Sequence, residues 1–287
     1  MEVITNIKIL REKIERIGSS SIGLIYTKGE LHKGHQSLIQ AARKENNLVI
    51  VANLLVPREF ESKEAYNLYP KYTEENRRLA SLAGADFFFT PDIEVFESEE
   101  MMVTIKINDG LKSELNGEGR PRYYEEQLVT LMKLLNITKA KQIYMSDKDL
   151  QQIYFTKMFL KQFHYDCKLK VLPAIRDKDG LVLSQRNRLL KLDEKKQICE
   201  IQKIFVKAQT AYERGMTSAR KIKWHVENEM TKLYLCRLEF VEILEPERLR
   251  KIETITDEAI LMIGIRVGLV RICDYTYLKV AEKVQEI

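Results

Sequence analysis

The sequence predicts an α/β fold, a parallel sheet with helices on both faces, followed by a smaller α+β domain. Up to about residue 187, short apolar runs rich in Ile, Val, Leu and aromatic residues alternate with stretches of helical periodicity. This alternation is typical of βαβ units, in which nucleotides bind at the C-terminal ends of the strands. After Asn187, helical stretches precede strand-like runs. We therefore expect a Rossmann-like catalytic domain at residues 1–187 and a smaller α+β lid domain at residues 188–287.

Each expected element rests on its length and periodicity. Apolar runs of strand length predict the strands of the first domain, at Ser20–Tyr26, Leu48–Leu55, Ala85–Phe89, Gln142–Met145 and Leu169–Ile175. Longer amphipathic stretches predict the helices between them, at His35–Lys44, Tyr72–Ala83, Tyr124–Leu135 and Leu150–Phe163. The second domain is expected to hold helices at Glu194–Arg214 and Ser218–Leu235, and strands at Leu238–Leu244, Ala259–Ile265 and Leu269–Cys273.

Composition and charge favour a globular intracellular enzyme. The 287 residues are 45% hydrophobic and 31% charged, which argues against a disordered chain. The 47 basic and 42 acidic residues leave a net charge of +5 in mixed runs, which is too weak and diffuse for a nucleic-acid partner. The first residues lack the apolar core of a signal peptide and no apolar run reaches membrane-spanning length, so we expect no membrane partner. The four scattered cysteines form no CxxC pair, which favours free thiols in the cytoplasm.

The most informative segment is Thr27–His35, which contains the pattern HxGH with His32, Gly34 and His35. It joins a predicted buried strand to a predicted helix. Free backbone N–H groups and the positive end of the helix dipole meet at such a turn and make it an anion site. Imidazoles add donors that follow charge developing on a phosphate. The segment therefore favours nucleotidyl transfer at the α-phosphate of a nucleoside triphosphate over a pair of solvent-exposed histidines.

Two further segments carry candidate chemistry before the predicted domain boundary. In the first, Lys148 follows a strand and suits neutralisation of triphosphate charge, while Gln152 lies one helical turn further on. Asp149 suits either the N-cap of the next helix or a contact with ribose. In the second, the Asp-Gly turn of Asp179–Asn187 is followed by a hydroxyl and a guanidinium suited to phosphate oxygens. No GxGxxG or Walker loop is present, so neither standard dinucleotide binding nor P-loop hydrolysis is indicated.

In their order along the chain, the motifs resemble those of the pantothenate synthetase (pantoate–β-alanine ligase) family. The likeness covers nearly the whole chain, and its segments are Thr27–His35, Pro57–Phe60, Tyr69-Pro70, Asn116–Pro121, Ser146–Gln152, Ser184–Asn187, Phe240–Pro246 and Arg271–Asp274. The resemblance implies an ATP-dependent ligase that works in two steps. A carboxylic acid first attacks ATP to give an acyl-adenylate and pyrophosphate, and an amine such as β-alanine then gives the amide and AMP. It also implies Mg²⁺ with the triphosphate and a homodimer.

The resemblance also assigns roles residue by residue. Triphosphate handling falls on His32, His35, Lys148, Ser184 and Arg186, with Gly34 and Gln185 in the same motifs. The ribose contact falls on Asp149, and a contact with the acid substrate falls on Gln152.

Departures from the family pattern gather on the acid-binding side. A Met beside the acid pocket is Lys28 here, a pocket Asn is Val56, and the pantoate-binding Gln is Glu59. The segment RPGHF reads Arg120–Tyr124 with Tyr123 in place of its His, and SSRN reads Ser184–Asn187 with Gln185 in place of its second Ser. ATP-side residues are mostly kept. A carboxylate at residue 59 would repel an acid substrate unless Lys28 neutralises it.

Three readings follow. The first and slightly favoured one is a ligase with an altered, more polar or zwitterionic acid, whose ammonium pairs with Glu59. The alternative is a genuine pantoate–β-alanine ligase in which Lys28 and Glu59 pair with each other. The third is a non-catalytic nucleotide-binding regulatory protein, which the joint presence of both histidines, Lys148 and Arg186 argues against.

Overall fold

The computed structural model describes residues 1–18, 21–60, 62–69, 73–97, 103–120, 122–268 and 270–280. These form two compact units, Met1–Ile175 and Arg176–Ile287. The predicted fold class is confirmed, because a parallel sheet with helices precedes a smaller antiparallel sheet with helices. The predicted assignment of catalytic and lid roles to residues 1–187 and 188–287 stays a prediction.

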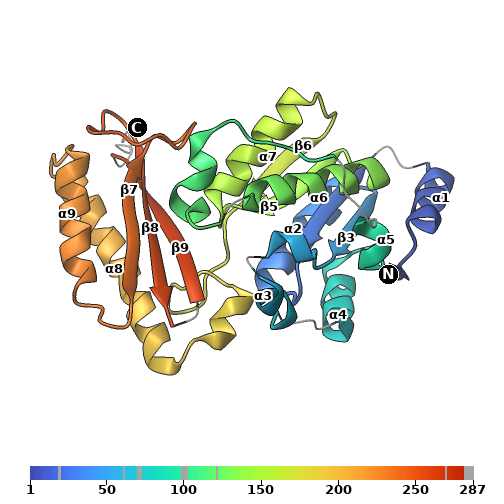
Figure 1. Ribbon diagram of the computed structural model, residues 1–287, viewed down its shortest axis with the longest axis horizontal. Helices are drawn as coiled ribbons and strands as arrows, with labels where there is room; N and C mark the ends of the chain where they lie inside the picture. Colours follow the sequence, from blue (N-terminus) through green and yellow to red (C-terminus); the bar gives the residue numbers. More distant parts are fainter. Residues whose placement is uncertain are drawn as a thin grey trace, which may run out of the picture. The chain divides into compact units, whose positions relative to one another are not determined.

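The N-terminal unit is built on a six-stranded sheet with the order β1-β4-β3-β2-β5-β6, and all its strand pairs are parallel (Figure 1). Its strands are β1 (Glu2–Ile4), β2 (Ile22–Thr27), β3 (Leu48–Asn53), β4 (Phe87–Phe89), β5 (Gln142–Ser146) and β6 (Lys168–Leu172). Every residue of β3 is buried, as expected for a central strand covered on both faces.

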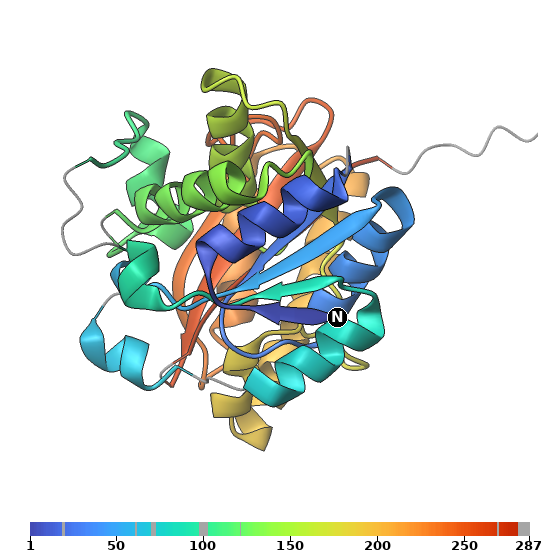
Figure 2. The same ribbon diagram turned by 90° about the vertical axis from the view of Figure 1, so that its right-hand side faces the viewer.

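Helices cover both faces of this sheet (Figure 2). The helices of the unit are α1 (Ile7–Ile17), α2 (Lys33–Glu45), α3 (Lys63–Asn67), α4 (Thr73–Ala83), α5 (Ile93–Glu97), α6 (Tyr123–Thr138) and α7 (Leu150–Gln162), with 3₁₀ turns at Pro57–Glu59, Gly110–Ser113 and Leu115–Gly117. Helices α2 and α4 pack together on one face, where Leu38 and Ile39 join Ile25, Val51 and Phe88 in one apolar core. Helix α6 packs against both α1 and α7.

The strand order places two distant turns side by side. From β2 the chain builds outward through β3 to β4, and it later returns to add β5 on the other side of β2. Strands β2 and β5 pair directly, with Gly23 opposite Gln142 and Leu24 opposite Ile143. Because the strands are parallel, the turns that follow β2 and β5 lie at the same edge of the sheet. This is the position at which open α/β sheets bind ligands.

The C-terminal unit is a three-stranded antiparallel sheet with two long helices (Figure 1). Its elements are a 3₁₀ turn at Gln185–Leu189, α8 (Leu192–Glu213), α9 (Ala219–Met230), β7 (Arg237–Leu244), β8 (Ala259–Val267) and β9 (Val270–Leu278). Ile201 of α8 and Ile222 of α9 pack with Leu261 and Ile263 of β8 in one core. Arg176 donates to both carboxylate oxygens of Asp274 at 2.7 Å and so fixes the start of this unit to β9.

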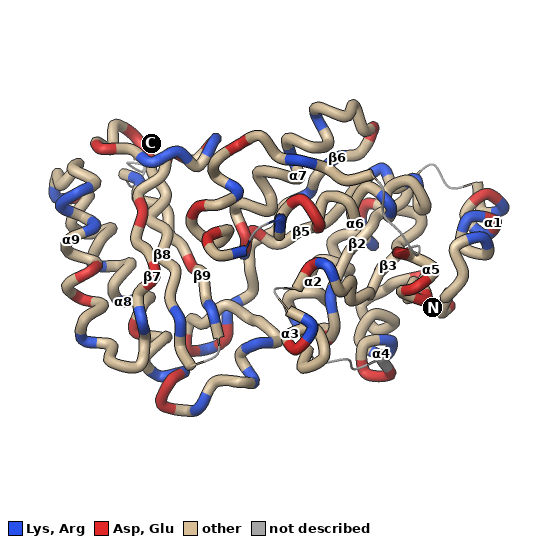
Figure 3. Tube along the Cα trace, viewed as in Figure 1, with Lys and Arg blue, Asp and Glu red and all other residues tan. Residues whose placement is uncertain are grey.

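Each predicted strand and helix has a counterpart, with ends shifted by a few residues. The sequence reading missed β1 and the short helices, because a three-residue edge strand and single-turn helices carry little periodicity. It also missed α1, although this helix has 11 residues and is amphipathic, with Leu10 and Ile14 buried. Ser20, Tyr72 and Leu269, the predicted starts of three elements, lie outside the described residues, as do Pro70 and Pro121 of the motif segments. Within the described ranges, no helix is long and apolar enough to cross a membrane. Basic and acidic residues are interspersed along both units (Figure 3).

Candidate active site

The two motif histidines form the N-terminal cap of α2. His32 is the N-cap residue, and its Nδ1 accepts a hydrogen bond from the backbone N–H of Gly34 at 3.1 Å. The Nδ1 of His35 accepts from the backbone N–H of His32 at 3.2 Å, and the two ring centroids are 4.0 Å apart. A neutral imidazole that accepts at Nδ1 carries its proton on Nε2. The geometry therefore assigns an Nε2–H donor to each ring.

Both imidazoles are held neutral at pH 7. Burial, followed by the charge of Lys148, lowers the pKa of His32 to about 4. Burial also holds the pKa of His35 well below its usual value, with smaller contributions from His32 and Lys148. Since the Lys148 ammonium acts on both rings, the structure brings together the turn after β2 and the turn after β5.

Gly34 is required by the close approach of the His32 ring. A Cβ atom at residue 34 would lie 2.9 Å from Cε1 and 3.0 Å from Nδ1 of that ring, closer than real side chains come. Gly29, earlier in the same turn, has a φ of 60°, in the left-handed region that favours glycine. The two glycines of the motif thus serve the backbone of the turn and the packing of an imidazole.

Two buried asparagines, absent from the sequence-based site, hold this turn in place. The side chain of Asn53 donates to Thr27 Oγ1 and to the carbonyl of Gly29, both at 2.7 Å. The Asn76 side chain donates to the same Gly29 carbonyl at 2.7 Å and accepts from the backbone N–H of Leu31 at 2.8 Å. Asn53 interrupts the apolar run Leu48–Leu55, which is a detectable signal. Asn76 lies in α4 and gives none, because one Asn in an amphipathic helix is ordinary.

The turn after β5 places Lys148, Asp149 and Gln152. Asp149 is the N-cap of α7, and its Oδ1 accepts from the backbone N–H of Gln152 at 3.0 Å and from the Tyr124 hydroxyl at 3.3 Å. Its Oδ2 accepts from the side chain of Asn116 at 2.9 Å. The capping role weighed from the sequence is therefore observed. The ribose contact of Asp149 and the acid contact of Gln152 stay predictions.

On the predicted acid side, Lys28 and Glu59 pair with each other. The Glu59 side chain is 0% exposed, whereas that of Lys28 is 21% exposed. The Tyr26 hydroxyl donates to the two carboxylate oxygens of Glu59 at 3.0 and 3.1 Å, and the Thr130 hydroxyl also donates to this carboxylate. A substrate ammonium would therefore find no exposed oxygen of Glu59 to contact.

Two cations lie over the ring of Tyr123. Its ring centroid is 3.4 Å from Cζ of Arg120 and 5.6 Å from Nζ of Lys28, within the range of cation–π attraction. Although burial opposes the charged form, the Glu59 carboxylate raises the pKa of Lys28 above its usual value. Val56 is fully buried directly before the 3₁₀ turn that carries Glu59. Lys28, Glu59 and Tyr123 thus form one cluster.

The third motif lies in the C-terminal unit. Ser184 is the N-cap of the 3₁₀ turn, and its hydroxyl accepts from the backbone N–H of Arg186 at 3.3 Å. Arg186 is exposed and Gln185 is buried. Because these residues belong to the other compact unit, their approach to the histidines stays a prediction. Among the described residues, no group of three or more His, Cys, Asp or Glu side chains is arranged to hold a metal ion.

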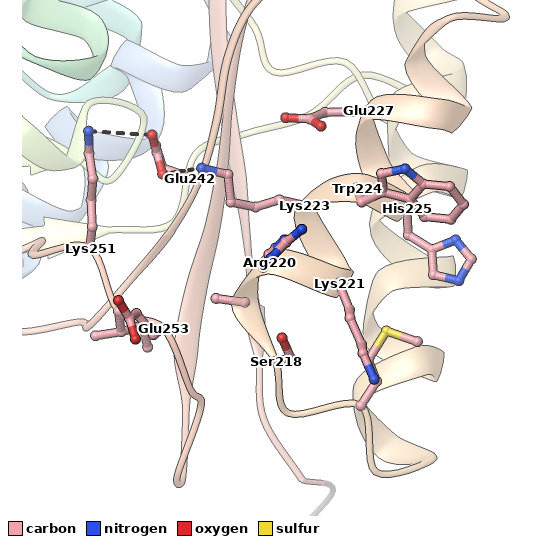
Figure 4. A pocket seen from close by; sticks show the side chains of 13 residues that line it. Ser218, Arg220, Lys221, Lys223, Trp224, His225, Glu227, Glu242, Lys251 and Glu253 are labelled. Carbon is pink, nitrogen blue, oxygen red and sulfur yellow. Dashed lines mark hydrogen bonds and ion pairs between the residues drawn. The ribbon is translucent and has the colours of Figure 1, made fainter.

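A separate hollow of about 990 Å³ lies beside α9 in the C-terminal unit (Figure 4). Lys223 and Lys251 both bind Glu242 there, at 2.7 and 3.4 Å, and Arg220, Lys221 and the exposed Trp224 also line it. None of the sequence-predicted site residues belongs to this hollow, so we do not include it in the candidate active site.

Neutral imidazole donors, a helix N-terminus and a lysine at the carboxyl ends of the central strands of a parallel sheet are typical of α/β enzymes that bind phosphate groups. The family described as pantoate-beta-alanine ligase matches residues 2–277, and the chain belongs to this family. The predicted resemblance is therefore confirmed. Together with its relatives, the family makes the chain an ATP-dependent, AMP-forming ligase.

Individual relatives agree with the family match. The pantothenate synthetase of Thermosipho africanus is 32% identical over 93% of this chain and 95% of that protein. The bifunctional pantoate ligase/cytidylate kinase of Trichormus variabilis is also 32% identical, over 91% of this chain, which spans only 50% of that longer protein.

Solved structures support the fold. Pantothenate synthetase from Thermus thermophilus aligns with a TM-score of 0.90 at 24% identity, over 96% of this chain and 99% of that one. Pantoate-beta-alanine ligase from Francisella tularensis, solved in complex with beta-gamma ATP and beta-alanine, aligns with a TM-score of 0.78 at 25% identity, over 96% and 97% of the two chains.

Proposed function

We propose that this protein condenses pantoate with β-alanine at the expense of ATP, with pyrophosphate and AMP as the other products. One arrangement supports the proposal: the two histidines cap the N-terminus of α2, and the charge of Lys148 acts on both of their rings. Such a turn offers donors without a full positive charge on either ring. The names of the relatives supply the substrates, since they are pantothenate synthetases and pantoate ligases.

In the first proposed step, an oxygen of the acid's carboxylate attacks the α-phosphorus of ATP, the bond to the bridging oxygen breaks, and pyrophosphate leaves. The Nε2–H groups of His32 and His35 donate to oxygens of the reacting phosphates. Lys148 neutralises charge that develops on them, as preorganised donors and cations do in phosphoryl transfer. Ser184, Gln185 and Arg186 are proposed to complete the phosphate contacts, and Asp149 to contact the ribose.

In the second proposed step, the neutral amine of β-alanine attacks the carbonyl carbon of the acyl-adenylate and AMP leaves with the electrons of the broken bond. The amine loses a proton as the amide forms. Holding both reactants in one site makes this step effectively unimolecular. We propose that the same cleft, with Gln152 near the acid, excludes water from the mixed anhydride.

Pantoate is the proposed acid despite the altered residues around it. The acid-side changes Lys28 and Glu59 form an internal ion pair, so the carboxylate of Glu59 presents no uncompensated negative charge to an acid substrate. Together with the names of the relatives, this pairing favours pantoate over the zwitterionic acid that the sequence alone suggested.

Three further expectations accompany this function. Mg²⁺ would enter with the triphosphate and neutralise its charge, since it commonly binds through substrate phosphates with few protein ligands. A homodimer is expected from the family resemblance. A cytoplasmic location agrees with the four cysteines, all of which are free thiols.

The test is product analysis with ATP, Mg²⁺, pantoate and β-alanine. The expected result is an amide together with equal amounts of AMP and pyrophosphate. ADP and phosphate as products would refute the adenylate route. Pyrophosphate release with another hydroxy acid or an amino acid, but not with pantoate, would instead support the altered-acid reading. Nucleotide binding without turnover of any acid would favour a regulatory protein.

A further inference from the structure

The two members of the ion pair between Lys28 and Glu59 differ in exposure. The Glu59 side chain is 0% exposed, whereas the Lys28 side chain is 21% exposed. Lys28 is therefore the member of the pair whose side chain reaches the surface of the unit.

The Glu59 carboxylate is stabilised by other donors besides Lys28. Hydroxyls of Tyr26 and Thr130 both donate to the Glu59 carboxylate. Arg58 donates to Thr130 Oγ1 at 3.2 Å and itself pairs with the carboxylates of Glu97 and Glu126. Because hydrogen bonds to an ionised carboxylate are strong, this negative charge is satisfied inside the protein.

Lys28 lies in the same turn as the histidines that we propose to bind phosphate. Lys28 directly follows β2 and precedes His32, the N-cap of α2, in the same turn. Its ammonium lies over the rings of Tyr26 and Tyr123, at 5.8 and 5.6 Å from their centroids. The Arg120 guanidinium also lies over the Tyr123 ring and adds a second cation. An anion at this edge of the sheet would meet positive charge on one side and imidazole donors on the other.

We propose that Lys28 binds the acid substrate through its carboxylate and that Glu59 is the positioning residue that fixes the lysine. This proposal rests on the proposed function and names the class of acid that fits: a short, singly charged hydroxy acid. One carboxylate oxygen is held by the ammonium, and the other stays available to attack the α-phosphate. A zwitterionic acid is disfavoured, because its own ammonium would approach Lys28 and Arg120.

The test removes both charges at once, because a single change leaves a buried charge uncompensated and can unfold the chain. The double variant Lys28→Gln/Glu59→Asn keeps polar groups at both positions, abolishes the cation and does not introduce the glutamine that the family carries at position 59. In pyrophosphate-release assays with pantoate, its KM for the acid should rise about 10- to 100-fold, the range for one lost charged hydrogen bond. The KM values for ATP and β-alanine should stay unchanged.

A matched control is available in the same unit. Lys112, 27% exposed, pairs at 2.6 Å with Glu125, 5% exposed, in an arrangement much like the pair under test. The double variant Lys112→Gln/Glu125→Gln should leave the KM for the acid unchanged. An equal rise in both double variants would overturn the proposal, because it would reflect a general loss of packing.

The role of Glu59 is tested by Glu59→Asn alone. A positioning role predicts a higher KM for the acid with kcat retained at saturating acid, whereas damage to the fold would lower kcat and leave that KM unaltered. An unchanged acid KM in active Lys28→Gln/Glu59→Asn enzyme, or a rise confined to ATP, would also overturn the proposal. These outcomes are distinct from failure of the proposed function, which would appear as absence of pantoate turnover in the unmodified protein. If pantoate is not turned over, the same variants would be assayed with the acid that does support pyrophosphate release. If none of the acids supports pyrophosphate release, both proposals are overturned.

Discussion

Acidification should destabilise the N-terminal unit through His32. In the folded chain the pKa of this half-buried ring is about 4, against an ordinary value of 6.5. Between these values the unfolded chain binds a proton that the folded chain does not, so stability is fully present above pH 6.5 and decreases as the pH falls toward 4. Integration of this difference from pH 7 to pH 5 gives a loss of about 2 kcal/mol from this residue alone.

The variant His32→Asn isolates this contribution from other titrating groups. Asn is among the best N-cap residues and does not titrate, so the cap of α2 is retained. Urea unfolding at pH 7 and pH 5, followed by circular dichroism, should show that the unmodified protein loses about 2 kcal/mol more than the variant. Trp224 is the single tryptophan of the sequence and lies in α9, so its fluorescence follows the C-terminal unit separately. Equal losses in both proteins would refute the inference that the fold holds this imidazole neutral.

Four further substitutions and one control variant test the site. His35→Ala or Lys148→Ala should lower kcat for pyrophosphate release about 100-fold or more in a folded protein, since one preorganised donor contributes about 3 kcal/mol. As a control, Lys141→Ala, which removes an ion pair with Asp166, should have no effect on kcat. Gly34→Ala should cost about 1 to 3 kcal/mol in thermal or urea unfolding, because its Cβ forces the capping imidazole to move. Asn76→Ala should cost about 1 to 3 kcal/mol and also slow turnover, because it leaves a buried N–H of the histidine turn without its acceptor; wild-type kcat would show that this turn needs no such support.

The sequence predicted the parts of the molecule that depend on local pattern. The βαβ alternation predicted the parallel sheet, and the HxGH motif predicted a turn at a helix N-terminus, because periodicity and capping chemistry act over a few residues. The pairing of Lys28 with Glu59 could only be posed as an alternative. Sequence supplies their charges, but only the packing of a 3₁₀ turn against β2 and α6 decides whether one faces the other or a ligand.

The contact of Asn76 that supports the histidine turn could not be predicted, for a related reason. Asn76 acts across 45 residues of sequence on the backbone of Leu31, a contact that no local pattern encodes. The neutrality of the histidines likewise depends on burial and on Lys148, both products of tertiary structure.

The adjacency of β2 and β5 has a consequence for when activity first appears. Asn46, the C-cap residue of α2, donates to the hydroxyl of Tyr144 in β5 across 98 residues of sequence, so joining β5 to the earlier strands closes a long loop. Contacts of such range form slowly compared with helices and neighbouring strands. During synthesis or refolding, the HxGH turn can be complete while Lys148 is still absent from it. Regain of turnover should therefore lag behind regain of helix signal.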